Sequence, residues 1–229
     1  MIEAVIFDLD GLLVDSEPVW DQARTSMADE VGRTWTEDDH RAVMGVSTQE
    51  WAAYMIKRLG LALTPEEVQD QVIARMVALY RRGIPYLPGA VEAVQLAASH
   101  LPTALASGSH RTLIDTITAD AAMRGKFQVI VAADEVGAGK PSPDVYLATA
   151  ERLGVRPERC ICLEDSGNGI LAGVRAGMKV IAVPDSRFAP KQSLLDQAHL
   201  VLPSLAAFSL DTLTLLGGVT DPKPDGLGF

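Results

Sequence analysis

The chain has 229 residues, enough for one large domain or for a domain that carries a sizeable insertion. Hydrophobic residues make up 48% and charged residues 22%, and 20 Lys and Arg against 30 Asp and Glu give a net charge of −10. This composition is that of an ordinary globular protein, and its acidic balance argues against nucleic acids or an anionic membrane as partners, since both bind basic surfaces.

The N-terminus and the cysteines bear on the cellular compartment. Met1-Ile2-Glu3 leads into an apolar run without the cationic segment of a secretory signal. No apolar stretch has the length of a membrane span. Cys160 and Cys162 lie in a predicted buried strand, where free thiols are the expected state. We expect a cytoplasmic protein, with a monomer as the default.

The chain opens with a short apolar run, Ala4–Phe7, that leads to Asp8, Asp10 and Gly11. Such a run is too short for a helix and is typical of a strand that is covered on both faces. Ligands of α/β proteins bind at the carboxyl ends of such strands. Side chains two residues apart in extended backbone point the same way, and two adjacent carboxylates need a cation or a proton between them. An ordinary Asp-Gly turn is the alternative explanation.

Strand signals stop in the region 15–87, and apolar residues there recur at helical spacing. One helix is predicted from Pro18, a favoured first-turn residue, and another over Trp51–Leu59. Thr64-Pro65-Glu66-Glu67 is a capping box that opens a further helix. These amphipathic helices predict a small bundle inserted after the first strand.

From Leu87-Pro88-Gly89 onward, the pattern alternates between helices and strands. Strands are predicted at Thr103–Ala106, Val129–Ala132, Cys160–Leu163, Val180–Val183 and Leu200–Leu202, and helices from near Ala90, His110, Pro143, Gly169 and Pro190. This alternation predicts a doubly wound parallel sheet. We expect an α/β protein with a Rossmann-like core of 1–14 and 88–229, a helical cap at 15–87 and a loose tail at 217–229.

Two of the predicted turns could bind an anion. Ser107-Gly108-Ser109 follows a strand and precedes a helix, so a hydroxyl and free N–H groups could hold an anion there, although an N-cap serine is the commoner explanation. Lys140 lies between a glycine and a proline, which is unusual for a solvated surface charge. It does not belong to a P-loop, because Asp134 and Pro141 stand where that motif needs Gly and Ser or Thr.

Glu164 and Asp165 follow another predicted strand, just before a glycine-rich turn. Two adjacent carboxylates at a strand end are electrostatically unfavourable without a metal. Oxygen ligands with open positions favour Mg²⁺. The sequence therefore predicts Mg²⁺ as the cofactor.

These stretches, taken in order, resemble the four motifs of the haloacid dehalogenase superfamily in the form used by its phosphotransferases. Asp8-Leu9-Asp10-Gly11 resembles the first motif, and Lys140-Pro141-Ser142-Pro143 resembles the third. The resemblance implies that Asp8 is a nucleophile that forms an aspartyl-phosphate and that Asp10 is a general acid and base. The phosphate-binding and metal-binding residues that it implies are Ser107, Gly108 and Lys140 for phosphate, and Asp8, Asp10, Asp165 and Glu164 for Mg²⁺.

The resemblance also implies residues in the cap and at the rim that select the substrate. These are Glu17, Trp20, Gly45, Val46, Ser47, Thr48, Ser109 and His110. The segment Asp15–Asp21 resembles the hexitol and 2-deoxyhexose-6-phosphate phosphatase branch. We therefore expect a Mg²⁺-dependent phosphomonoesterase that acts on small-molecule sugar phosphates such as hexose or hexitol phosphates, with phosphoglycolate or a nucleotide as other possible substrates.

Three alternatives stay open. A β-phosphoglucomutase-type enzyme would carry a histidine where Trp20 stands and an arginine where Thr48 stands. A dinucleotide-binding protein would explain the glycines in the segment 167–172, but it would put the carboxylates of 164 and 165 beside a pyrophosphate. A non-catalytic protein that binds phosphorylated metabolites would not need a nucleophile such as Asp8.

Overall fold

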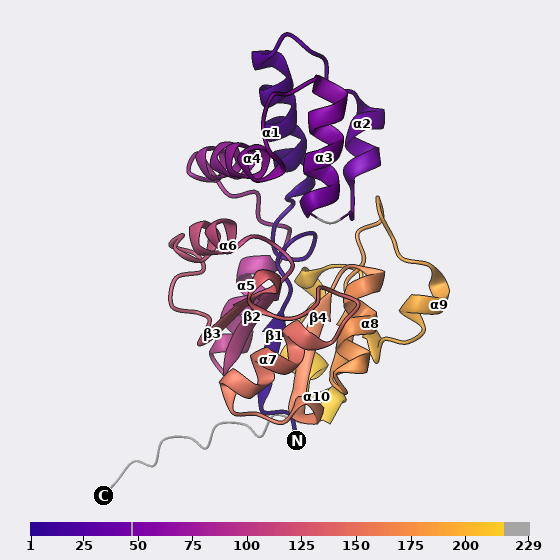
Figure 1. The fold of residues 1–229 in the computed structure, drawn as a ribbon. Helices are drawn as coiled ribbons and strands as arrows, with labels where there is room; N and C mark the ends of the chain where they lie inside the picture. The colour runs from indigo at the N-terminus through magenta and orange to yellow at the C-terminus, as the bar shows by residue number, and fades with distance from the viewer. Residues whose placement is uncertain (47, 218–229) are drawn as a thin grey trace, which may run out of the picture. The chain divides into compact units, whose positions relative to one another are not determined.

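The computed structural model describes residues 1–46 and 48–217, and Figure 1 shows the fold. The chain divides into two compact units: a helical unit, Ser16–Pro85, and a core unit, Met1–Asp15 together with the chain from Tyr86 onward. We propose these boundaries for the two domains in place of 15–87. Within the described ranges, the helices are too short or too polar to cross a membrane.

The core unit is built on a parallel sheet. Within the described residues it has six strands in the order β3-β2-β1-β4-β5-β6, and each neighbouring pair is parallel. The strands are β1 (Ala4–Phe7), β2 (Thr103–Ser107), β3 (Val129–Ala132), β4 (Cys160–Glu164), β5 (Lys179–Ala182) and β6 (Leu200–Val201). The predicted doubly wound α/β fold is confirmed. The strand order reverses at β1, which is where ligands of such sheets bind.

The helices of the core unit lie between the strands in the sequence. They are α5 (Ala90–Ala98), α6 (Arg111–Thr118), α7 (Asp144–Leu153), α8 (Gly167–Arg175), α9 (Gln192–Leu195) and α10 (Leu210–Gly217), with short 3₁₀ turns η1 (Ala133–Glu135), η2 (Pro157–Arg159) and η3 (Leu205–Ala207). Helix α8 begins earlier than the predicted Gly169, because the Ser166 hydroxyl accepts a hydrogen bond from the Gly169 N–H at 3.0 Å and so caps the helix. Gly217, expected in the tail, ends α10, and 218–229 lies outside the described residues.

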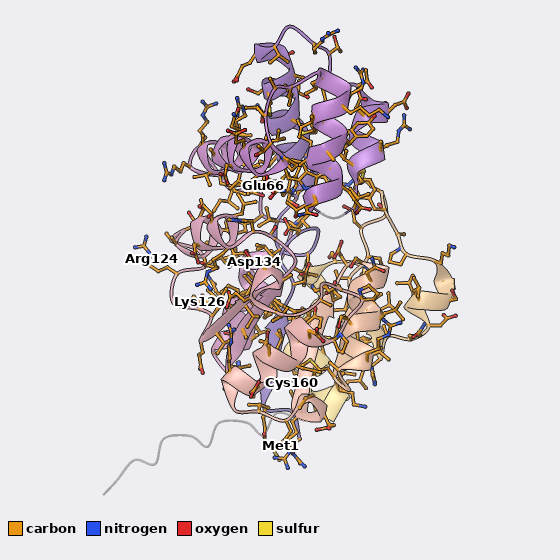
Figure 2. All side chains as sticks on the ribbon, in the orientation of Figure 1. Met1, Glu66, Arg124, Lys126, Asp134 and Cys160 are labelled. Atoms are coloured by element: carbon orange, nitrogen blue, oxygen red, sulfur yellow. The ribbon has the colours of Figure 1, made fainter. Side chains whose placement is uncertain are left out.

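Apolar side chains cover both faces of the central strands. Every residue of β1, β2 and β4 is buried. Helix α7 packs on β2 and β3, while α8 packs on β4 and β5, and the two helices contact each other (Figure 1). Cys160, labelled in Figure 2, and Cys162 are buried with free thiols, and burial raises the pKa of Cys160 to about 12.

The helical unit consists of α1 (Glu17–Glu30), α2 (Glu37–Val43), α3 (Thr48–Leu59) and α4 (Pro65–Tyr80). Helices α1 and α3 pack on α4, and α2 packs on α3. The predicted capping box opens α4: the Thr64 hydroxyl accepts from the Glu67 N–H at 3.2 Å, and the Glu67 carboxylate accepts from the Thr64 N–H at 2.8 Å.

Helix α2 was not predicted, because its mostly charged sequence shows no apolar periodicity. It is held by Asp39, whose buried carboxylate accepts hydrogen bonds from the Thr36 N–H at 2.9 Å, the Tyr54 hydroxyl at 2.8 Å and the Arg58 Nε at 2.7 Å. Burial alone would raise the pKa of Asp39, but Arg58 and the other donors hold it well below the usual 3.8. This carboxylate joins α2 to α3.

We expect Asp39→Asn to destabilise the helical unit by about 1–3 kcal/mol, because it weakens charge-assisted hydrogen bonds to a buried group. The folded state holds the pKa of Asp39 below its ordinary value of 3.8, so the contribution is present above that pH and is lost as the pH falls through the folded-state pKa. Urea unfolding should therefore give the same difference in free energy of unfolding between Asp39→Asn and wild type at about pH 8 and at about pH 5.

Asp38→Asn is the matched control, because the Asp38 side chain is 91% exposed and, among the residues that the structure describes, pairs only with Arg41 on the surface. We expect it to change stability by about 0.5 kcal/mol or less. Equal unfolding midpoints for the two variants would show that the Asp39 contacts do not hold the unit together.

Candidate functional site

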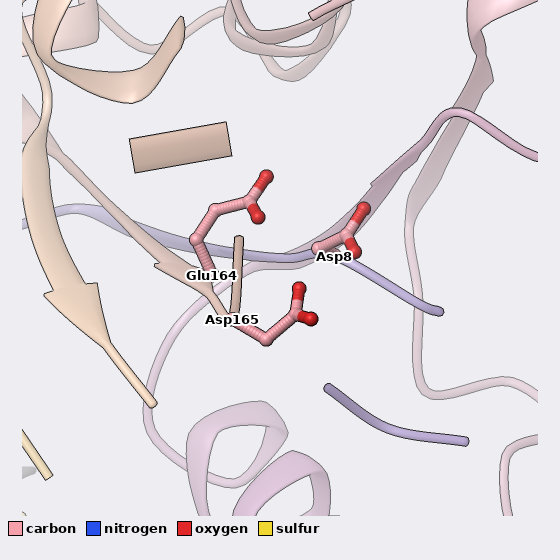
Figure 3. Close-up of side chains that lie close together, drawn as sticks. All are labelled: Asp8, Glu164 and Asp165. Carbon is pink, nitrogen blue, oxygen red and sulfur yellow. The ribbon is translucent and has the colours of Figure 1, made fainter. Parts of the chain in front are cut away.

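Acidic side chains converge at the carboxyl ends of β1 and β4, which are neighbours at the point where the strand order reverses. Asp8 directly follows β1, Glu164 ends β4 and Asp165 follows it. One oxygen atom from each of these carboxylates lies within 4.8 Å of the others. Figure 3 shows the three side chains close together at the two strand ends.

Lys140 provides a positive charge in this cluster. It lies in the loop between η1 and α7, and its Nζ donates hydrogen bonds to Asp8 Oδ1 at 2.5 Å, to Glu164 Oε1 at 2.5 Å and to the Ala106 carbonyl at 3.2 Å. An ammonium group has three N–H donors, so these contacts use all of them. A direct contact with phosphate, which the sequence resemblance implies for Lys140, would require it to share or exchange one of these partners.

Burial and mutual repulsion disturb the ionisation of the cluster. Burial raises the pKa of Asp8 to about 7; Lys140 opposes this shift, while Glu164 adds to it. Burial, together with the charges of Asp8 and Glu164, raises the pKa of Asp165 to about 8. The pKa of Lys140 is raised, because attraction to Asp8 and Glu164 outweighs the effect of burial. The carboxylates therefore need further positive charge to stay ionised together near neutral pH.

A divalent cation fits these residues. The donors are carboxylate oxygens, which suit a hard cation such as Mg²⁺, and they lie close enough together to share one ion. Asp8 and Asp165 also carry the raised pKa values that a cation would reverse. Glu164 is turned toward Lys140, so it bears on the site at least as a partner of the lysine.

Asp10 and the serines after β2 form a second group of contacts. The Ser109 hydroxyl donates to Asp10 Oδ2 at 2.5 Å, and the Ser107 hydroxyl lies 3.4 Å from the same oxygen. The buried Ser107 hydroxyl also accepts from the Ser109 N–H at 3.0 Å. Gly108 between them is exposed. Ser109, expected as a substrate contact, thus has the Asp10 carboxylate as a partner.

His110, the other residue expected at the rim of the core, caps helix α6. Its Nδ1 accepts a hydrogen bond from the Thr112 N–H at 3.2 Å, and its side chain is exposed. This bond leaves the proton of a neutral imidazole on Nε2, which is then a donor on the exposed side of the ring.

Most of the residues expected to select the substrate lie in the helical unit. Trp20 on α1 packs edge-on against the buried Trp51 on α3, with ring centroids 5.9 Å apart, and the Arg24 guanidinium lies 4.9 Å from the Trp20 ring. Glu17 lies 3.5 Å from His40. The remaining candidates fall at the start of α3: Gly45 and Val46 are exposed, Thr48 begins α3, and Ser47 lies outside the described residues.

Sequence reasoning missed Tyr146, on the first turn of α7. Its hydroxyl donates to Glu164 Oε1 at 2.5 Å, and its ring centroid lies 5.1 Å from Lys140 Nζ. The signal that could have found it is a residue with a polar tip on the buried face of the helix that follows the lysine, since a buried tyrosine hydroxyl needs a partner.

Packing accounts for the glycines that resembled a dinucleotide fingerprint. A Cβ on Gly169 would lie 1.8 Å from Glu164 Oε2, and a Cβ on Gly167 would lie 2.5 Å from the Leu194 side chain. These glycines are needed because a carboxylate and an apolar side chain approach the backbone. A bound pyrophosphate is not required to explain them.

The chain is similar to known proteins over most of its length. Residues 2–177 match the family model of the haloacid dehalogenase-like hydrolases. The chain is 36% identical over 220 residues to hexitol phosphatase B of Escherichia coli (strain K12), which covers 93% of this chain and 95% of the relative. It is 34% identical over 182 residues to the phosphorylated carbohydrates phosphatase of Thermotoga maritima, which covers 79% of this chain and 84% of the relative. The crystal structure of CbbY from Rhodobacter sphaeroides in complex with phosphate superposes with a TM-score of 0.79 at 28% identity, covering 90% of this chain and 96% of that one.

We expect Gly11→Ala to weaken Mg²⁺ binding by about tenfold or more, as measured by isothermal titration calorimetry. Gly11 has a φ of +76°, and a Cβ there would lie 2.3 Å from Asp165 Oδ2, so alanine would push this carboxylate out of the cluster.

Gly125→Ala is the matched control. Gly125 has a φ of +70° and no atom within 4 Å of its Cβ position, so alanine causes the same backbone strain there without touching the cluster. If Gly11→Ala binds Mg²⁺ with wild-type affinity, Asp165 is not a ligand of the ion.

Proposed function

The chain belongs to the haloacid dehalogenase-like hydrolases, and from this premise we propose that it is a Mg²⁺-dependent phosphatase of small phosphorylated metabolites. The observation that carries the proposal is the position of Asp8. This buried carboxylate lies where the strand order reverses, shares Lys140 with Glu164 and belongs to a group of carboxylates close enough together to hold one metal ion. A protein that only binds phosphate would gain nothing from placing a carboxylate there.

In the proposed first step, a carboxylate oxygen of Asp8 attacks phosphorus and forms an aspartyl-phosphate, while the bond between phosphorus and the ester oxygen breaks. Asp10 donates a proton to the departing oxygen. In the second step, water attacks the aspartyl-phosphate, Asp10 takes up a proton from that water, and inorganic phosphate leaves. Asp8 is then a free carboxylate again, and Asp10 is again protonated.

The metal ion and the surrounding residues would stabilise and position Asp8 and the phosphoryl group. Bound Mg²⁺ would supply positive charge next to the phosphoryl oxygens and offset the repulsion of the carboxylates. Asp8 and Asp165 would hold the ion, with Glu164 and the Asp10 carbonyl as the other proposed ligands. The Lys140 ammonium would keep Asp8 ionised and in place, and Ser107 and Gly108 would bind the transferred phosphoryl group.

Sugar phosphates are the substrates we propose, such as hexose or hexitol phosphates. The names of the relatives support this class, since they include a hexitol phosphatase and a phosphatase of phosphorylated carbohydrates. The residues that we propose to select the sugar are Glu17, Trp20, Gly45, Val46, Ser47, Thr48, Ser109 and His110.

A phosphoglucomutase activity is the second candidate, since a solved structure that resembles this chain carries the name β-phosphoglucomutase. The contacts of Trp20 favour the phosphatase. Its indole packs against Trp51 beneath Arg24 and has no group that could exchange a proton with a sugar hydroxyl. Water is then the better acceptor of the phosphoryl group.

We expect the wild type to release phosphate from hexose or hexitol phosphates, and EDTA to abolish this release. Asp8→Asn should lower kcat by roughly 10⁴-fold or more, because the amide is a poor nucleophile. A malachite-green phosphate assay over a panel of sugar phosphates, phosphoglycolate and nucleotides measures both effects.

Asp211→Asn, an exposed substitution on α10, is the control and should keep wild-type activity. Substantial Mg²⁺-dependent turnover by Asp8→Asn would refute the nucleophile assignment. If folded wild type releases no phosphate but converts β-glucose 1-phosphate in the presence of a bisphosphate primer, the mutase is the correct function.

We expect Ser109→Ala to lower kcat/KM for sugar phosphates by about tenfold, because Asp10 loses the hydrogen bond that orients it. The loss should be much smaller for p-nitrophenyl phosphate, whose leaving group departs without a proton from Asp10. Steady-state kinetics with both substrates test this. An equal loss in kcat/KM for the two substrates would mean that Ser109 does not act through the proton that Asp10 donates to the leaving group.

A further inference from the structure

The fully buried Tyr146 makes two contacts with charged groups of the site. Its hydroxyl donates to Glu164 Oε1 at 2.5 Å, and its ring lies against the Lys140 ammonium, with Nζ 5.1 Å from the centroid. A cation over an aromatic face is attracted to it, more strongly where water is excluded. Tyr146 therefore contacts both members of the Lys140–Glu164 ion pair.

Both oxygens of the Glu164 carboxylate have partners. It is fully buried, and its Oε1 accepts from both Lys140 and Tyr146. The Ser166 hydroxyl lies 3.3 Å from Oε2, and the Gly169 backbone lies so close that any Cβ would overlap the carboxylate. The Ser166 hydroxyl also caps α8, whereas the Tyr146 hydroxyl can be removed without touching a helix cap.

A chain of contacts connects Tyr146 to Asp8, the proposed nucleophile. Glu164 Oε1 contacts both the Tyr146 hydroxyl and the Lys140 ammonium, and this ammonium also donates to Asp8. Without the tyrosine hydroxyl, Glu164 would have Lys140 as the remaining donor to Oε1 among these contacts. The ammonium would then be drawn toward Glu164, since a buried carboxylate that loses a hydrogen bond relies more on its counter-ion.

We propose that Tyr146 is a positioning residue of this site: its hydroxyl holds Glu164 so that Lys140 is shared with Asp8 and the acidic cluster keeps the shape that binds Mg²⁺. The role in turnover rests on the proposed phosphatase function. The role in metal binding does not, because it concerns only the residues of the cluster.

The test is Tyr146→Phe, which keeps the ring and its contact with Lys140 and removes only the hydroxyl. We expect the dissociation constant for Mg²⁺, measured by isothermal titration calorimetry, to rise by about tenfold or more, as is typical when an outer-shell partner of a metal site is lost. We expect kcat for the best substrate of the panel to fall by about 10- to 100-fold with KM unchanged, because Tyr146 does not touch substrate.

A double-mutant cycle with Glu164→Gln separates positioning from packing. If Tyr146 acts through Glu164, adding Tyr146→Phe to Glu164→Gln should cost little more in Mg²⁺ affinity. Tyr54→Phe is the matched control, since it removes a hydroxyl bound to a carboxylate, Asp39, in the helical unit. It should leave Mg²⁺ affinity and kcat at the wild-type values.

Wild-type Mg²⁺ affinity in Tyr146→Phe would overturn the proposal, and so would the same loss of affinity in the Glu164→Gln background. If Glu164→Gln does not fold, the comparison of Tyr146→Phe with wild type still decides. A wild type that turns over no phosphate ester would contradict the proposed function, whereas the Mg²⁺ titrations would still test the role of Tyr146.

Discussion

The candidate site depends on one ammonium group that two buried carboxylates share. Lys140 has a side chain that is 12% exposed, and it joins Asp8 to Glu164, which is fully buried. Removing charges from water is costly, and the cost is offset only where each group is paired and hydrogen-bonded. Lys140 is paired and hydrogen-bonded in this way, because its ammonium contacts the Ala106 carbonyl as well as the two carboxylates. Glu135, in the turn η1 before the loop that carries Lys140, pairs with Arg111 of α6 and Arg152 of α7.

The strand order explains why residues so far apart in sequence meet. All neighbouring strands of the described sheet are parallel, so the turns after β1, β2 and β4 lie at the same edge. Strand β1 pairs with β2 on one side and with β4 on the other. Asp8 is therefore placed between the serine turn at Ser107 and the acidic pair at Glu164.

The polar ends of the strands could be predicted from the sequence, but their contacts could not. Asp8 and Glu164 stand out because carboxylates break an apolar run, and this is a local signal. The bond between Tyr146 and Glu164 joins residues on different elements and depends on how α7 sits on the sheet, which no local pattern encodes. Helix α2 was missed because a charged segment stabilised by Asp39 has no apolar period, although the Thr36 capping box was present in the sequence.

The glycines after β4 show why spacing alone does not identify a ligand. A glycine pattern at a strand end reports that something approaches the backbone closely, and in dinucleotide-binding proteins that group is a pyrophosphate. In this chain the groups are the Glu164 carboxylate, which lies over Gly169, and the Leu194 side chain, which packs on Gly167. An anion such as pyrophosphate would be repelled by the same carboxylate that requires the glycine. The carboxylate that ends the strand therefore accounts for the glycine that it overlies, and it favours a cation over an anion at this edge of the sheet.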